Sequence, residues 1–125
     1  MIAIDTSSWS AYLADEVGSD VEQVAQSLEL GHAVLPPVVL SELLSNPKLP
    51  GPIAKLFLEL PVLELSPGYW ERTGRLRAKV LARGLRARLA DTLIAASCID
   101  HRVPLVTRDP DFRHFVKLGG LELAR

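Results

Sequence analysis

The segment from Ala90 to Phe112, ADTLIAASCIDHRVPLVTRDPDF, constrains the fold of this chain more than any other. It predicts a buried helix entered through an aspartate, then a short apolar strand from Val103 to Thr107, then a turn that holds Asp109 and Asp111. In a parallel α/β sheet, the groups that bind ligands gather beyond the carboxyl ends of the strands. Asp91 and Asp109 are therefore expected to lie at one edge of such a sheet.

The N-terminus repeats the pattern of an apolar strand that ends in an acid. Met1 to Ile4 are apolar, and the polar triplet DTS follows, beginning at Asp5. A first strand would place Asp5 at its carboxyl end and leave the next threonine or serine free to cap a helix. Asp5, Asp91 and Asp109 thus become candidates for a single cluster.

Short apolar runs alternate with helical periodicity along the whole chain. The expected strands cover residues 1–4, 33–35, 62–65, 103–107 and 121–123, and the expected helices cover 8–14, 20–30, 38–44, 53–60, about 67–83 and a segment from about 90. This alternation predicts an α/β fold with a parallel five-stranded sheet and right-handed crossovers. With 125 residues, 48% of them hydrophobic, the chain has the size and apolar content for one domain over residues 1–125.

Several classes of protein are disfavoured by composition. There is no apolar run of about 18 residues and no basic leader, so we expect no membrane span, no signal peptide and a cytoplasmic protein. The single cysteine, Cys98, lies in an apolar helical pattern and is interpreted as a buried structural thiol. His32, His101 and His114 show no zinc-ligand spacing, so a zinc site is not expected.

Charge is unevenly distributed although the net charge is only -1. Between Glu71 and Arg88 there are seven basic residues and one acid, a local charge of +6 against about -7 elsewhere. The candidates for contacts with phosphate groups are Lys79 and Arg83 in the helical stripe, and Arg86 and Arg88 just before Asp91. The alternatives are a solvated helix face and ion pairs with the acids.

Four acids are candidate members of a single site: Asp5, Glu42, Asp91 and Asp109. Asp111 is a further candidate. Glu42 stands among apolar neighbours in a predicted helix, where burying a carboxylate is costly. Taken singly, the aspartates could cap helices or complement a helix dipole, and Glu42 could pair with an arginine. Two unit charges about 4 Å apart repel by roughly 4 kcal/mol at an effective dielectric of 20, so a cluster of them implies a cation. Oxygen ligands favour Mg²⁺ or Mn²⁺.

A hard divalent ion beside a basic surface suggests phosphodiester hydrolysis. Such an ion can activate a water molecule and neutralise charge on a phosphate. A response-regulator receiver domain also carries acids at strand ends, but its sequence pattern has paired acids after the first strand and a lysine after the last strand. This chain has a single acid, Asp5, after the first strand and no such lysine.

Three motifs resemble those of PIN-domain ribonucleases of the VapC toxin family, over nearly the whole chain. They are IDTS from Ile4, LSEL from Leu40, and the pair DTLIAA from Asp91 with LVTRDPDF from Leu105. The resemblance implies a PIN-like three-layer fold with strand order 3-2-1-4-5 and Mg²⁺- or Mn²⁺-dependent cleavage of RNA. It also implies a homodimer and a cognate VapB-type antitoxin that covers the active site.

The resemblance carries over to individual residues. It implies that Asp5, Glu42, Asp91 and Asp109 bind one or two metal ions, with Asp111 close enough to share or replace the fourth position. Thr6 and Thr107 match hydroxyl positions that hydrogen-bond the acids or a metal-bound water in similar proteins; the alternative for both is backbone capping. A catalytically silent module that binds RNA or a protein is the alternative function.

Overall fold

A parallel sheet forms the centre of the computed structural model, which describes residues 1–125. Strand β1 (Ile2–Ile4) lies between β2 (Ala33–Val34) and β3 (Leu105–Val106). Ile2 pairs with Ala33, and Ala3 pairs with Leu105. The central position of β1 brings its carboxyl end beside that of β3.

Two isolated parallel bridges extend the sheet at both edges. Leu35 pairs with Val62, and Leu105 pairs with Leu123. Counted along the chain, the five paired segments lie in the order 3-2-1-4-5, which confirms the predicted α/β fold. The two outer segments are shorter than the strands expected there, because each contributes only one bridge. Pro61, which lacks an N–H donor, precedes the first of them.

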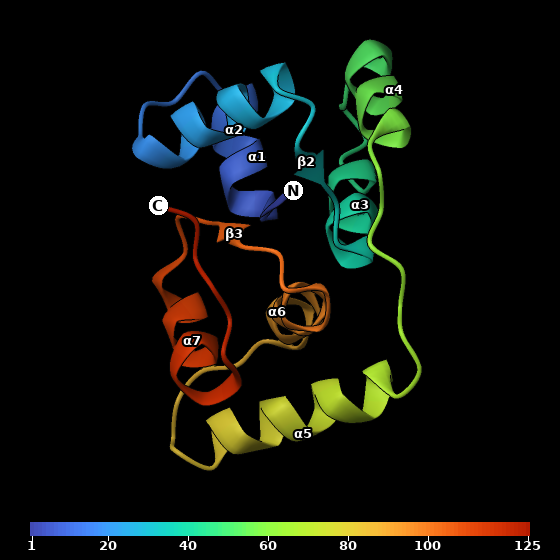
Figure 1. Cartoon of the computed structure of the whole chain (residues 1–125). Coiled ribbons are helices and arrows are strands. Elements are labelled where there is room, and N and C mark those ends of the chain that lie inside the picture. Colours follow the sequence, from blue (N-terminus) through green and yellow to red (C-terminus); the bar gives the residue numbers. More distant parts are fainter.

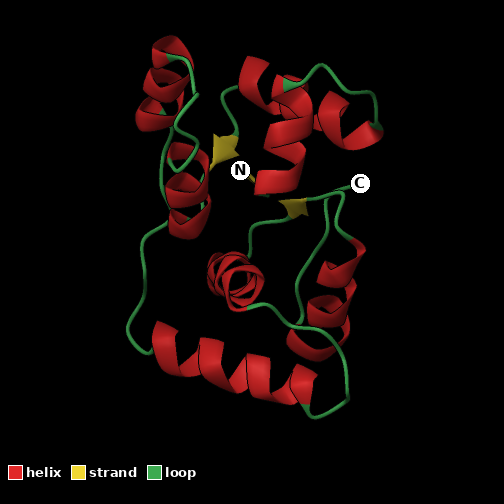
Figure 2. Ribbon diagram, turned by 180° about the vertical axis from the view of Figure 1, so that it is seen from behind, coloured by secondary structure: helices red, strands yellow, loops and turns green.

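Helices cover both faces of the sheet (Figures 1 and 2). Their bounds are α1 (Thr6–Leu13), α2 (Ser19–Glu29), α3 (Pro37–Leu44), α4 (Gly51–Glu59), α5 (Tyr69–Leu81), α6 (Leu89–His101), the 3-10 helix η1 (Pro110–Phe112) and α7 (Arg113–Gly119). In Figure 1, α1 and α2 lie on one side of the strands, and α6 lies on the other, flanked by α5 and α7. The result is the expected arrangement of three layers.

Helix α6 is the central helix of the fold. Apolar and small residues surround most of its circumference, and Ile94, Ala95 and Cys98 are completely or almost completely buried. Such an all-round apolar helix is stable only inside a core. The helix ends at Arg102, which adopts a left-handed conformation with φ 53° and turns the chain toward β3. The first helical turn of α6, which contains Asp91, therefore lies at the opposite end of the helix from Arg102.

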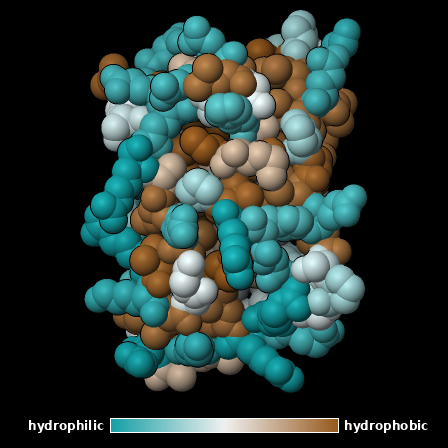
Figure 3. All heavy atoms as spheres, in the orientation of Figure 1, coloured by the Kyte–Doolittle hydropathy of each residue, from teal (hydrophilic) through white to brown (hydrophobic).

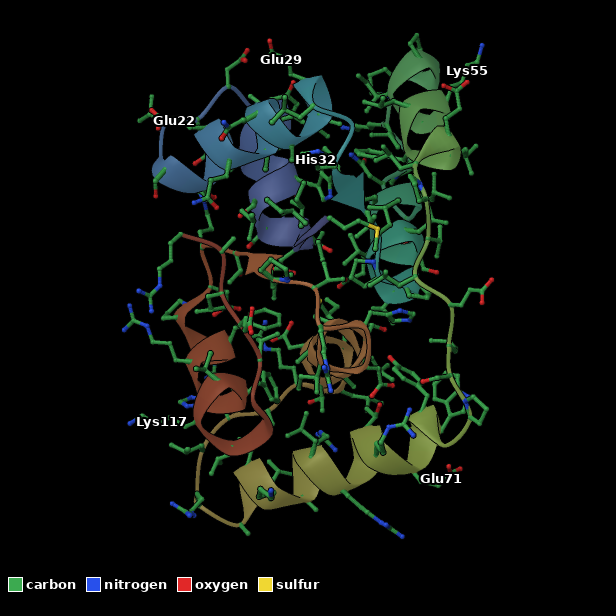
Figure 4. The ribbon with its side chains drawn as sticks, in the orientation of Figure 1. Glu22, Glu29, His32, Lys55, Glu71 and Lys117 are labelled. Atoms are coloured by element: carbon green, nitrogen blue, oxygen red, sulfur yellow. The ribbon has the colours of Figure 1, made fainter.

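The hydrophobic core is continuous across the layers. Its largest buried side chains include Trp9, Phe57, Phe112 and Phe115, and the rings of Trp9 and Phe57 meet edge to face with centroids 5.0 Å apart. Figure 3 shows apolar atoms reaching the surface between polar side chains. In Figure 4, charged side chains such as Glu22, Lys55 and Lys117 point away from this core. No helix has the length and apolar character required to span a membrane.

Candidate active site

Asp5 occupies the carboxyl end of β1 and is almost completely buried, with 4% of its surface exposed. Its Oδ2 accepts hydrogen bonds from Ser7 Oγ at 2.7 Å and from Thr107 Oγ1 at 2.8 Å. Burial raises the pKa of Asp5 above its usual value, while the hydrogen bonds oppose the rise and the charge of Asp109 adds to it. A buried carboxylate in this state favours a positive charge nearby.

Helix α1 begins earlier than the sequence pattern suggested. It starts at Thr6 rather than at residue 8, and Asp5 takes the N-cap position without making a side-chain cap. The prediction that the threonine or serine after Asp5 caps this helix is therefore wrong. Their hydroxyls donate to carboxylates instead: Ser7 to Asp5, and Thr6 to Glu42.

The turn after β3 joins the fourth acid to the first. Thr107 Oγ1 donates to Asp5 and accepts from the backbone N–H of Asp109 at 3.0 Å. Asp109 Oδ1 accepts from the N–H of Asp111 at 2.9 Å and so caps η1. The capping role considered for Asp109 is thus present, and it uses one of the two carboxylate oxygens. Asp111 Oδ2 lies 4.0 Å from Arg86 Nη1.

Asp91 lies in the first turn of α6 and is partly exposed. Burial raises its pKa to about 6, and the charges of Asp5 and Asp109 add to the rise. Arg88 opposes the rise, and Glu42 contributes the last of these effects. Because charges act on a pKa only at short range, the effects of Asp5, Asp109 and Glu42 mean that Asp91 lies near carboxylates from three other segments.

Glu42 differs from the sequence expectation of a buried, costly carboxylate. Its side chain is exposed, because Val39 and Leu43 fill the core-facing side of α3. Its partner is also different from the arginine considered as an alternative: Thr6 Oγ1 donates to Glu42 Oε1 at 2.7 Å. Thr6 thereby connects the start of α1 to α3.

The basic residues divide into two groups. Arg88 precedes α6 and acts on the pKa of Asp91, and Arg86 lies opposite Asp111. Arg83 is exposed in the turn after α5. Lys79 is directed elsewhere: its Nζ donates to Leu118 O at 3.2 Å and lines a separate cavity between α5, α6 and α7.

Two features of the site were missed at the level of sequence. Arg77 Nε donates to Ala87 O at 2.8 Å and holds the loop that carries Arg86 and Arg88. Arg108, in the turn between Thr107 and Asp109, forms hydrogen bonds with Asp20 rather than with an acid of the site. The excess of basic residues between Glu71 and Arg88 gave a weak signal for Arg77, but nothing local indicates a partner for Arg108.

The arrangement fits a divalent cation in its donor chemistry. The candidates are carboxylate oxygens, and a cation would offset both the burial of Asp5 and Asp91 and the repulsion between the acids. In this structure no group of three or more acidic, histidine or cysteine side chains is placed so that it could hold a metal ion. Hydroxyl donors orient two of the carboxylates: Ser7 and Thr107 donate to Asp5, and Thr6 donates to Glu42.

Residues 2–118 match the sequence profile of the PIN domain. The chain belongs to the PIN domain family. This membership confirms the family resemblance seen in the three motifs, and PIN domains are generally nucleases, commonly with divalent metals. No curated protein was found whose sequence matches that of this PIN domain.

Several solved structures share the fold of this PIN domain, and one of them is described as a member of the VapBC family of toxin–antitoxin systems. VapBC2 from Rickettsia felis, bound to a promoter DNA fragment, has a chain that is 22% identical, with coverage of 99% of this chain and 98% of that one and a TM-score of 0.71. VapBC-5 from Mycobacterium tuberculosis is 20% identical, with coverage of 99% and 97% and a TM-score of 0.65. FitAcB from Neisseria gonorrhoeae is 21% identical, with coverage of 100% and 97% and a TM-score of 0.70.

Proposed function

We propose that this PIN domain is a metal-dependent endoribonuclease and the toxin of a toxin–antitoxin pair. The observation that carries the proposal is the hydrogen-bonded arrangement that joins Asp5 to the Asp109 turn through Thr107 and Glu42 to the start of α1 through Thr6. Asp91 lies near these acids, and its burial together with their charges raises its pKa to about 6. Membership of a family of nucleases and the fold shared with toxin–antitoxin structures support it.

In this proposal the four acids hold Mg²⁺ or Mn²⁺, and hydrogen bonds involving threonine hydroxyls support three of them. Asp5 and Asp109 are joined through the Thr107 hydroxyl, and Glu42 is oriented by Thr6. Asp111 stands beside Arg86 as the alternative fourth ligand. A bound divalent ion would supply an activated water and would neutralise charge on the scissile phosphate.

The chain's own residues would orient the RNA and limit access of bulk water. Burial of Asp5 closes the sheet side of the site, so a substrate approaches from the side of Arg86 and Arg88. These two arginines are the proposed contacts for the phosphates next to the cleaved bond, with Arg83 further along the backbone. Attack opposite the leaving 3′ oxygen would give products with 5′-phosphate and 3′-hydroxyl ends.

The proposed partners follow from the same resemblance. Complexes named VapBC and FitAcB are among the structures that share this fold. We therefore propose a cognate VapB-type antitoxin that covers the carboxylates, and a homodimer as the working form of the toxin. The antitoxin must be removed before activity is measured.

The test is cleavage of a mixed panel of single-stranded RNAs by the antitoxin-free protein in Mg²⁺, Mn²⁺ or EDTA. Asp91→Asn is the inactive variant, and Asp100→Asn is the matched control, because Asp100 lies on the same helix but pairs with Arg72 at 2.6 Å. We expect metal-dependent cleavage that is lost in Asp91→Asn and kept in Asp100→Asn. Full activity of Asp91→Asn would contradict the site, and RNA binding without cleavage in any metal would favour the silent binding module.

A further inference from the structure

A second charged network lies outside the proposed metal ligands and centres on Asp20, in the first turn of α2. Asp20 Oδ2 accepts from Ser8 Oγ and from Arg108 Nε, both at 2.8 Å. Asp20 Oδ1 accepts from Arg108 Nη2 at 3.0 Å. The Arg108 guanidinium also reaches Glu16 Oε1 at 3.3 Å. The Asp20 side chain is 12% exposed and the Arg108 side chain 33% exposed, so the carboxylate is the more buried partner.

The two donors to Asp20 come from the two segments that carry the first and fourth acids. Ser8 is completely buried on α1, one turn beyond Asp5. Arg108 stands between Thr107, which donates to Asp5, and Asp109. Asp20 therefore joins α1 to the turn after β3. Figure 1 shows α2 packed along α1 near β3.

The backbone near Asp20 is shaped for this ion pair. Gly18 has φ +156°, and a Cβ built there would lie 2.6 Å from Asp20 Oδ1 and 3.1 Å from Arg108 Nη2. Any side chain at position 18 would therefore displace the paired groups. The atoms that such a Cβ would meet are the ends of two flexible side chains, so the distances show that Gly18 lies directly against the ion pair.

We propose that Asp20 and Arg108 are positioning residues that fix the turn of residues 107–109 against α1 and so set the separation between Asp5 and Asp109. The inference rests on the proposed metal site. Groups that orient metal ligands from behind typically change metal affinity by 10- to 100-fold when they are removed. Arg108 is thus assigned a structural role in the site. From its place in the sequence beside Asp109, a positively charged side chain would instead suggest a contact with an RNA phosphate.

Mn²⁺ binding to the full-length protein, measured by calorimetry without RNA, tests the assignment. Arg108→Met removes a positive charge near the acids, so electrostatics alone would make Mn²⁺ bind more tightly. Positioning predicts the opposite sign, a loss of about tenfold in Mn²⁺ affinity. Asp20→Asn, which keeps the size of the side chain, is expected to lower the affinity in the same direction.

The matched control is Arg72→Met, which breaks a similar ion pair. Arg72 Nε and Nη2 donate to the two Asp100 oxygens at 3.1 and 2.6 Å, between α5 and α6. We expect Arg72→Met to keep wild-type Mn²⁺ affinity even where its melting temperature falls as far as that of Arg108→Met. Arg108→Lys keeps the charge and provides a milder variant if Arg108→Met fails to fold; positioning predicts weaker Mn²⁺ binding there also.

The outcomes separate the inference from the function on which it rests. Wild-type affinity in Asp20→Asn and in the Arg108 variants would overturn the positioning role and leave the metal site standing. Tighter Mn²⁺ binding by Arg108→Met would do the same. A wild-type protein that binds no Mn²⁺ would overturn both the metal site and the positioning role.

Discussion

Replacement of Asp91 with asparagine is expected to stabilise the metal-free protein at neutral pH while it abolishes the proposed activity. Burial raises the pKa of Asp91 from 3.8 to about 6, and the neighbouring charges of Asp5 and Asp109 contribute. Asparagine has nearly the same size and carries no charge. It therefore removes the repulsion and the cost of desolvating an ion, together with a proposed metal ligand.

The magnitude follows from the linkage between protonation and folding. At about 1.36 kcal/mol per pH unit, the difference between the two pKa values corresponds to about 3 kcal/mol. Because the side chain is partly exposed, solvent screening reduces this value, and we expect about 1 kcal/mol. The pKa of Asp91 is higher in the folded state than in the unfolded state, so protonation of Asp91 favours folding. This contribution of the wild-type side chain is complete below about pH 3.8 and is lost as the pH rises through about 6.

Urea unfolding in EDTA at pH 7.5 and pH 4 measures the effect. Asp91→Asn should exceed the wild type in free energy of unfolding at pH 7.5, and the two proteins should converge at pH 4. The control Asp100→Asn should lose stability at pH 7.5, because hydrogen bonds from Arg72 and Ser66 outweigh the effect of burial and lower the pKa of Asp100. An Asp91→Asn protein no more stable than wild type at pH 7.5, or equally stabilised at both pH values, would refute the reasoning.

Three further predictions concern other groups. Thr107→Val should lower the free energy of unfolding by about 2 kcal/mol, because it removes a hydrogen bond to the buried Asp5 carboxylate, whereas Thr107→Ser should remain close to wild type in urea unfolding. Arg108 holds the pKa of Asp20 at about 2, so this pair contributes stability above about pH 3.8 that is lost as the pH falls through about 2. Asp20→Asn should therefore be about 1 kcal/mol less stable than wild type at pH 6. In acid unfolding curves this difference should vanish near pH 2. Burial raises the pKa of the Cys98 thiol to about 12, so iodoacetamide at pH 8 should label it only in guanidinium, as mass spectrometry would show; rapid labelling of the folded protein would contradict its burial.

Short-range sequence patterns determined much of this fold. Apolar runs that end in acids located β1 and β3 with Asp5 and Asp109 beyond them, and the apolar periodicity around Cys98 correctly indicated a buried helix. These features depend on neighbouring residues, because a strand or a helix selects its buried positions through its own repeat. The family motifs then supplied the strand order, which periodicity alone does not contain.

Tertiary structure decided how the acids are held. Glu42 is exposed although its sequence neighbours are apolar, since the orientation of α3 sets which of its faces meets the core. Lys79 belongs to the basic stripe in sequence but donates to the backbone of Leu118 in α7. Arg108 and Asp20 are 88 residues apart and meet only because α2 packs beside β3. The sequence by itself thus determined which residues stand at the strand ends, whereas their partners, exposure and charge state depend on contacts between distant segments, which no local pattern encodes.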